Sequence, residues 1–449
     1  MGFSGPTTGD VTALYWNPAA LGLIQDYQLV VSGSLQVTSA TVQRSAIDPA
    51  TGAAGGSRSF ASASGRSVVH PLAWPLGPGG FVGVGAGIGH RFAIALGAYS
   101  PYAERMTFEA SSTGEQPSRY HLIKVNARHL ALVPGLAIHA SESLQIGVAP
   151  GFLFSSGHLV FDEDTALADP SILGAENPAA AARYDLASRG TQTPSYFVSG
   201  GIHYRRGRLD LGLSYTSAPL GSDGAVRLPI ERSQVTLAGA DLCNGLAQPC
   251  ATGQLEYKLP DFFIGGVTWH ATPRLSVTGI VRWLRYGGHD RVSVRLVGPA
   301  GGGLGTAAPD SLVLYRGFQD SWDVRGRLIY VIGRWVRLSG TLRAETSAVP
   351  AANLNAAAID GFKLEPALAA ELSLWGRVRL EAGYAFQWMH PASGGEAFDP
   401  TAAAACARAS GDLSTPACRQ RMTGTARPSA VGRYELTRHT FSVLTKVSF

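Results

Sequence analysis

Hydrophobic and polar residues alternate along many segments of the chain. Residues 335–345, WVRLSGTLRAE, place valine, leucine, glycine and alanine on one side and arginine, serine, threonine and glutamate on the other. Residues 323–331 and 377–386 follow the same rule. Because successive side chains of a β-strand point to opposite faces, the pattern predicts strands with one apolar and one polar face.

The alternation predicts fourteen strands, joined by connections that are short and long in turn. Short turns on one rim and long loops on the other, with an even number of antiparallel strands, are typical of a transmembrane β-barrel. The predicted strands cover residues 27–44, 66–88, 91–105, 119–139, 144–160, 193–206, 208–218, 254–271, 274–286, 315–332, 335–346, 362–375, 377–389 and 434–449.

A soluble sandwich is the alternative, because its strands also alternate and bury their apolar faces in a core. The asymmetry of the rims and the aromatic residues near strand ends favour the barrel, whose apolar faces contact lipid. No run of about 18 or more apolar residues occurs, which excludes a helical membrane protein. The aromatic residues are Trp16, Trp74, Trp269, Trp283, Trp335, Trp375 and Trp388.

The last residues, RHTFSVLTKVSF, also alternate. Phe441, Val443 and the terminal Phe449 share one face, and Lys446 lies on the other. A chain that ends on the phenylalanine of such a strand resembles the C-terminal signal of bacterial outer-membrane barrels.

Composition and charge change this picture little. The chain has 449 residues, 55 glycines, 15% charged residues and a net charge of +5. The basic residues are dispersed singly along the strands, so we do not expect nucleic-acid binding. Residues 1–9 lack the basic and apolar regions of a signal peptide, so an exported chain is expected to be a mature or trimmed form.

The four cysteines fall as two local pairs, Cys243 with Cys250 and Cys406 with Cys418. Close pairs in polar loops predict disulfides and an oxidising compartment, and free thiols are the alternative. Neither pair has the spacing of a zinc site and no histidine lies within either loop, so we expect no metal.

Several segments, spread over nearly the whole chain, resemble the long-chain fatty acid transporters of the outer membrane, a family that includes toluene and xylene uptake channels. The resemblance implies a monomer of the bacterial outer membrane that binds a hydrophobic small molecule, contacts membrane lipid and lipopolysaccharide, and has neither a cofactor nor catalytic activity. The segments are YWNPAAL (15–21), LGAYSPYAER (96–105), VPGLAIHASESLQIGVAPGF (133–152), LGLSYTSAP (211–219), YKLPDFFIGGVTW (257–269), GFQDSW (317–322) and LRAETSAVP (342–350).

The resemblance further implies that residues 1–26 form a shortened hatch inside a barrel of residues 27–449. Asn17, Pro18 and Ala19 would hold the hatch in a fixed turn, since Asn-Pro is turn chemistry. Glycines with lumenal parity would leave room for it, and an ordinary turn beside a flexible strand is the alternative. These glycines are Gly83, Gly85, Gly87 and Gly97.

The family implies capture between long loops, a pocket above the hatch, and sideways exit through the wall near a kinked third strand. Pro101 lacks a ladder donor and either opens this gap or ends the strand. Residues 161–192 are expected to form an extracellular loop with short helices. Its apolar residues either line the capture groove or pack the loop on itself; they are Leu167, Ile172 and Leu173.

Leu159 and Leu314 occupy positions at which the fatty-acid member of the family carries basic residues for the carboxylate. His158 and Arg316 lie close by in the sequence. A carboxylate buried without a partner is unfavourable, so either these neighbours bind it or the ligand is a neutral aromatic or aliphatic hydrocarbon. Interior charges usually pair with one another, which predicts a lumenal salt-bridge ladder of Arg325, Arg327, Arg337, Arg343, Glu345, Arg379 and Glu381.

Two other functional classes are the alternatives to a transport barrel. His289 beside Asp290 on a loop does not make a catalytic triad without a positioned nucleophile, so we do not expect an enzyme. A structural barrel without transport is the remaining alternative.

Overall fold

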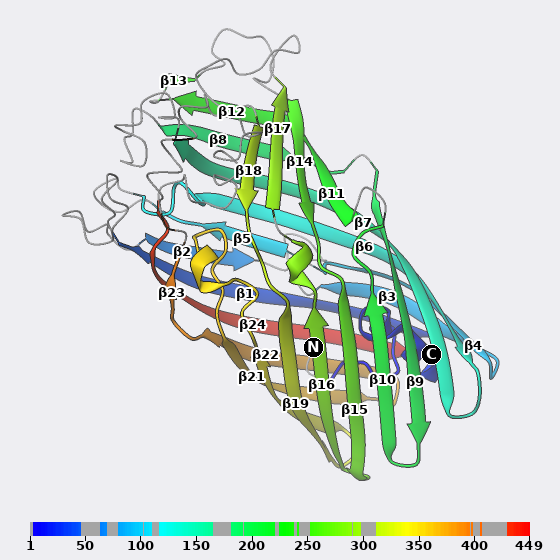
Figure 1. Ribbon diagram of the computed structural model, residues 1–449. Helices are drawn as coiled ribbons and strands as arrows, with labels where there is room; N and C mark the ends of the chain where they lie inside the picture. Colours follow the sequence, from blue (N-terminus) through cyan, green and yellow to red (C-terminus); the bar gives the residue numbers. More distant parts are fainter. Residues whose placement is uncertain are drawn as a thin grey trace.

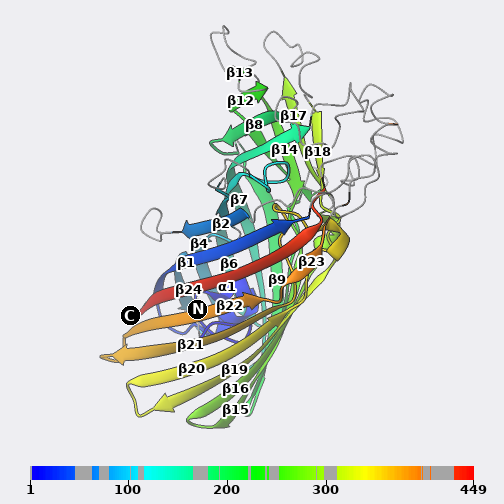
Figure 2. The ribbon, with the colours of Figure 1, turned by 90° about the vertical axis from the view of Figure 1, so that its left-hand side faces the viewer.

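The structure is a computed structural model, in which an antiparallel barrel encloses a short N-terminal segment and carries a second sheet beyond one end (Figures 1 and 2). No helix in the described part of the chain is long and apolar enough to cross a membrane. The described residues are 3–45, 63–69, 80–101, 103–109, 116–164, 181–191, 193–220, 224–237, 240–241, 252–289, 291–297, 311–395, 397, 405 and 429–449.

Fourteen of the described strands form the barrel wall, and each pairs antiparallel with the next, so the predicted barrel is confirmed. They are β1 (Gln28–Arg44), β3 (Phe81–Ile88), β4 (Phe92–Tyr99), β6 (Lys124–His139), β7 (Leu144–Asp164), β9 (Ser195–Arg206), β10 (Leu209–Thr216), β15 (Phe262–Thr272), β16 (Leu275–Leu284), β19 (Ser321–Ile332), β20 (Val336–Glu345), β21 (Lys363–Leu374), β22 (Val378–Met389) and β24 (Gly432–Ser448). β24 closes the ring by pairing with all 17 residues of β1. A closed sheet presents no open edge to lipid.

The outward face of the wall is apolar, as a lipid-facing surface requires. Leu368 is 71% exposed and Val443 is 63% exposed. Exposed aromatic side chains lie at both ends of the wall, including Trp335 and Trp375 at the short turns and Trp322 at the opposite end. Trp16 was wrongly assigned to these belts, because it is buried inside the barrel, and Trp74 lies outside the described residues.

A second sheet continues beyond the barrel in the order β11 (Ala225–Ile230), β14 (Thr252–Lys258), β17 (Arg291–Val297) and β18 (Ser311–Tyr315) (Figure 1). Opposite it, β8 (Ala181–Ser188) extends the wall from β7, followed by β12 (Arg232–Leu237) and β13 (Ala240–Asp241). The facing apolar sides pack together, with Phe161, Tyr184 and Val294 in the shared core.

Most of these strands correct the sequence analysis, which predicted long loops for the residues of β8, β11, β12, β13 and β17 and for most of β18. β14 was predicted as the start of one continuous strand over residues 254–271, but it belongs to the second sheet and is separate from β15. Residues 181–188, expected within a loop with short helices, are a strand because they pair with the upper part of β7. The strands persist beyond the membrane because they bury apolar side chains between two sheets.

The third wall strand is interrupted between β4 and β5 (Ala103–Thr107), which both pair with β6. Tyr99 pairs with Ala131, and Ala103 pairs with Arg128. The chain therefore advances by four residues on this strand while β6 advances by three. One extra residue, next to Pro101, therefore forms a β-bulge, which re-aims the side chains that follow it. The second strand, expected to be continuous over residues 66–88, consists of β2 (Ala63–Val69) and β3.

A second interruption lies between β6 and β7. Their pairing stops at Leu132 with Phe152 and resumes at Leu136 with Val148. Pro134 and Pro150 lie between these points, and neither residue has an amide hydrogen to donate.

A lipid-facing wall predicts a depth-dependent penalty for charge. Leu368→Arg, midway along β21, should lower the free energy of unfolding in micelles by about 2–4 kcal/mol, whereas Leu374→Arg, on the same face at the strand end, should cost about 0–1 kcal/mol. Urea titration followed by tryptophan fluorescence measures both values. Equal losses at the two depths would contradict a lipid-covered surface.

Candidate functional site

Residues 3–24 lie inside the barrel lumen and are called the plug here (Figure 2). They contain the short helix α1 (Ala13–Trp16) and the 3-10 helix η1 (Pro18–Leu23). Val11, Leu14 and Leu21 are completely buried against the inner face of the wall. The plug thus packs directly against the inner face of several wall strands.

Asn17 joins the two turns of the plug to each other and to the wall. Its side-chain oxygen accepts a hydrogen bond from the Ala19 amide at 3.2 Å and caps η1, whose first residue is Pro18. Its Nδ2 donates to the carbonyl of Pro6 at 2.9 Å and to that of Ile202 on β9 at 3.0 Å. Proline suits the first position of a helix because its φ is already helical.

The four glycines predicted to face the hatch lie directly against the plug. A Cβ at Gly83 or Gly85 would lie 2.8 or 3.0 Å from Val11, and one at Gly97 would lie 2.7 Å from Leu14. At Gly87 the nearest atom would be the carbonyl oxygen of Ile24 at 2.5 Å. No larger side chain fits at these positions unless the plug shifts.

Polar side chains of the wall hold the plug from several directions. His139 hydrogen-bonds to the carbonyl of Gly22 at 2.7 Å, and the Ser214 hydroxyl donates to that of Trp16 at 2.6 Å. Arg327 donates to the carbonyl of Ser4 at 2.8 Å, and Lys446 on the closing strand pairs with Asp10 at 3.7 Å.

Above the plug lies a cavity of about 590 Å³, with Tyr15 of the plug among its lining residues. One side is apolar and is formed by β7, β8, β15, β16 and the second sheet. Its residues are Leu159, Leu186, Leu228, Ile230, Leu255, Phe262 and Leu284. The other side is charged and is formed by Glu104, Arg282, Arg343, Glu345, Asp360, Lys363 and Arg438. The cavity therefore has an amphipathic lining.

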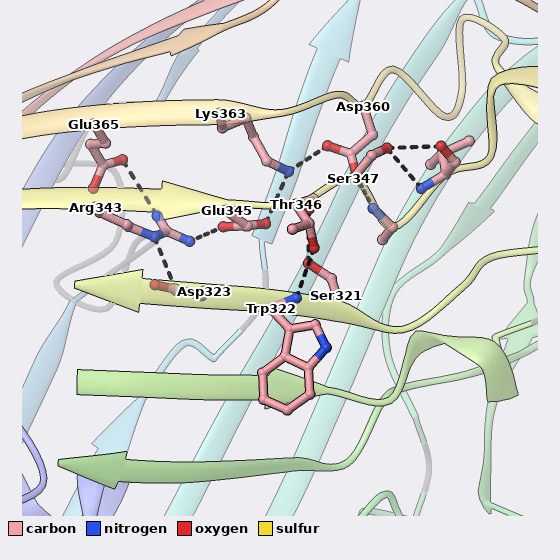
Figure 3. A network of polar contacts seen from close by, with 12 residues as sticks. Ser321, Trp322, Asp323, Arg343, Glu345, Thr346, Ser347, Asp360, Lys363 and Glu365 are labelled. Carbon is pink, nitrogen blue, oxygen red and sulfur yellow. Dashed lines mark hydrogen bonds and ion pairs between the residues drawn. The ribbon is translucent and has the colours of Figure 1, made fainter.

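A network of ion pairs organises the charged side (Figure 3). Asp323, which is fully buried, accepts hydrogen bonds from Arg282 at 2.9 Å, Arg325 at 2.6 Å and Arg343 at 3.0 Å. Arg343 also contacts Glu345, which pairs with Lys363 at 2.9 Å, and Lys363 contacts Asp360. Arg282 reaches the plug through the Tyr15 hydroxyl at 3.2 Å.

The predicted ladder is thus divided by the structure. Arg325, Arg343 and Glu345 belong to the network, whereas Arg337 pairs separately with Glu371 at 2.9 Å. The other predicted members lie apart from the network: Arg327 holds the plug, Glu381 is 5% exposed, and Arg379 is exposed near the short turns.

The residues expected near the head group lie in different places. His158 and Leu159 both line the cavity, and His158 is hydrogen-bonded to Asp185 at 2.8 Å. Arg316 lines the cavity and donates to the carbonyl of Ala357 at 2.8 Å. Leu314 is 5% exposed and lies in the shared core between the second sheet and the strands that extend the wall.

Of the other sequence candidates, His289 reaches this site, and the rest lie outside the described residues. His289 lines the cavity, where it hydrogen-bonds to the Lys258 carbonyl and lies 5.1 Å from the Phe318 ring. The positions outside the described residues are Leu167, Ile172, Leu173, Cys243, Cys250, Asp290, Cys406 and Cys418.

The bulge of the third strand opens onto the cavity, because Ser100, Pro101, Ala103 and Glu104 all line it. Sequence analysis did not identify Glu104 as a cavity residue.

Two phenols outside the membrane-spanning strands also line the cavity. Burial raises the pKa of Tyr257 on β14 and of Tyr286 in the 3-10 helix η6 (Tyr286–Gly288). Both phenols therefore stay neutral at physiological pH.

Comparisons with known proteins place this geometry among transport barrels. The model of the family described as "Outer membrane protein transport protein (OMPP1/FadL/TodX)" matches residues 1–353. A FadL homologue of Pseudomonas aeruginosa superposes with a TM-score of 0.75 at 14% identity, over 100% of this chain and 96% of that one. No curated protein matches the chain significantly.

Two toluene transporters are also similar in structure. TbuX of Ralstonia pickettii has a TM-score of 0.62 at 12% identity, and TodX of Pseudomonas putida has 0.63 at 14%. Each comparison covers 100% of this chain and 96% of the other. At these identities the likeness is one of fold.

The close fit between wall and plug predicts the effect of one added methyl group. A Cβ at Gly147 would overlap the backbone between Pro18 and Ala19, whereas one at Gly200 would have no neighbour nearer than 4.0 Å. Gly147→Ala should therefore displace the plug and raise ion conductance in planar bilayers, and Gly200→Ala should not. Unchanged conductance in Gly147→Ala would show that this part of the plug does not occlude the lumen.

Proposed function

The chain belongs to the outer membrane transport protein family that includes FadL and TodX, and we propose that it takes up long-chain fatty acids. The protein is an integral barrel of the bacterial outer membrane and a hydrophobic uptake channel. The finer assignments, namely substrate and route, rest on the chemistry of the cavity. No catalytic activity is proposed.

The observation that carries the proposal is the two-sided polarity of the cavity. Its volume of about 590 Å³ lies within the range of about 300–1,000 Å³ for ligand pockets. An acyl chain against the apolar side gains about 0.8 kcal/mol for each buried methylene. A carboxylate at the charged side avoids burial without a partner, which is unfavourable.

The proposed route has three stages. The ligand is captured at the extracellular end, enters the cavity above the plug, and leaves sideways at the bulge beside Pro101. Exit into lipid is favoured over exit into water, because returning apolar surface to water costs about 25 cal/mol per Å². Pro101 lies both in the bulged strand and on the cavity lining.

Uptake of neutral aromatic or aliphatic hydrocarbons is the second candidate. It is supported by the pairing of Arg282, Arg343 and Lys363 with carboxylates, which leaves these cations satisfied without an anionic ligand. TbuX and TodX are described as toluene transporters. Mass spectrometry of lipids that co-purify with the barrel separates the candidates, since fatty acids support the first and neutral hydrocarbons the second.

Sideways exit predicts a specific effect of removing the extra residue of the bulge. Deletion of Pro101 should restore continuous pairing with β6, close the wall and lower uptake of radiolabelled hexadecanoate by whole cells at least about tenfold, because the ladder is no longer interrupted. Hexadecanoate binding to the purified barrel should remain. Pro101→Ala, which keeps the extra residue, should retain most uptake.

Pro150→Ala is the control at the other interruption of the wall, away from the cavity, and should leave uptake unchanged. Normal uptake after deletion of Pro101 would contradict exit at this bulge. Lost uptake in Pro150→Ala, with uptake retained in the deletion, would move the exit to the seam between β6 and β7.

A further inference from the structure

A second cavity, of about 270 Å³, adjoins the first on the inner face of β1, β5 and β24. Six residues line both cavities, which places the junction beside the bulged strand. They are Gln36, Ala103, Glu104, Ile359, Leu436 and Arg438. Two of the six, Glu104 and Arg438, are charged.

Arg438 differs from the other cations of the charged side. Its Nε donates to the Thr38 hydroxyl at 3.1 Å, and no carboxylate of the described residues lies within ion-pair distance of it. Arg282, Arg343 and Lys363 each make such pairs. A guanidinium has five N–H donors, so Arg438 has donors available for an anionic ligand.

Lys258 also lines the cavity without a described ion pair, but it is exposed at the end of β14, next to the apolar side. A head group there would place an acyl chain toward the charged network. Arg438 allows the opposite and more favourable arrangement, with the chain directed to the apolar side.

Glu104 gives the junction a second property. It follows the bulge, makes no ion pair with the described residues, and acts electrostatically on Arg316 and Arg438. In its ionised form Glu104 repels a ligand carboxylate at Arg438. The repulsion lowers affinity at the point where the cavities meet the interrupted strand, which assists release.

We propose that Arg438 binds the carboxylate head group of the transported molecule and that Glu104 limits the affinity of this subsite. The inference rests on the proposed function, since it locates the head group of an amphipathic ligand. It also explains how a chain with Leu159 and Leu314 at the positions named above accommodates an anion, because the charge is supplied by the closing strand.

Two probes of equal chain length test the proposal on the purified barrel by isothermal titration. Arg438→Gln should weaken hexadecanoate binding by about tenfold or more, as expected for a lost charge-assisted hydrogen bond, and leave hexadecan-1-ol binding unchanged. Glu104→Gln should tighten hexadecanoate binding alone. Arg438→Lys should keep part of the affinity, and Lys258→Gln should have little effect.

The outcomes separate this inference from the proposed function. If the wild type binds neither probe, or only the alcohol, uptake of fatty acids is wrong. If it binds both probes but Arg438→Gln changes neither or weakens both equally, the subsite is overturned while the channel function stands. Heat-modifiable migration in gels confirms that each variant is folded.

Discussion

The pairing of β24 with β1 is the interaction on which the rest of the structure depends. It joins the last strand of the chain to the first along 17 residues, and only a closed sheet satisfies its backbone groups in lipid. Closure also fixes which side of every strand faces the lumen. Successive side chains of each strand alternate between the lipid and the lumen, and the plug, the ion pairs and the cavity all lie on the lumenal side.

The lumen accommodates a buried plug and buried charges by different means. Glycines remove side chains where the plug approaches the wall, as at Gly83 and Gly97. Charged side chains satisfy one another, with Asp323 accepting from three arginines. Among the described residues of the charged side, Arg438 makes no ion pair with a carboxylate and has donors to spare, and it lies next to the interrupted strand.

The barrel was predictable because period-two alternation and turn length report directly on strands that face lipid on one side and the lumen on the other. The same alternation exists in RVSVRLV, residues 291–297. Alternation alone does not separate a wall strand from one beyond the wall, and the sequence analysis predicted these residues as part of a long loop. Trp16 was misplaced because an aromatic residue near a strand end fits either a belt or a buried plug.

The site was less predictable, because the spacing of residues along one strand does not show which side chains meet across neighbouring strands. Arg438 shares lumenal parity with Lys446, so its face could have been inferred. That no described carboxylate lies within ion-pair distance of it depends on neighbours distant in sequence. The inward position of Glu104 was harder still to predict. Tyr99 and Glu104 both face inward although their positions differ by five, an odd number, because the bulge shifts the parity of the strand.

The most direct test of the account is spin labelling of the closing strand at residues 441–444 in reconstituted bilayers. Labels at Phe441 and Val443 should be accessible to oxygen dissolved in the lipid, and labels at Ser442 and Leu444 should be protected from it. Loss of this alternation, or access of a water-soluble relaxation agent to the outward pair, would contradict a closed barrel whose apolar face is covered by lipid.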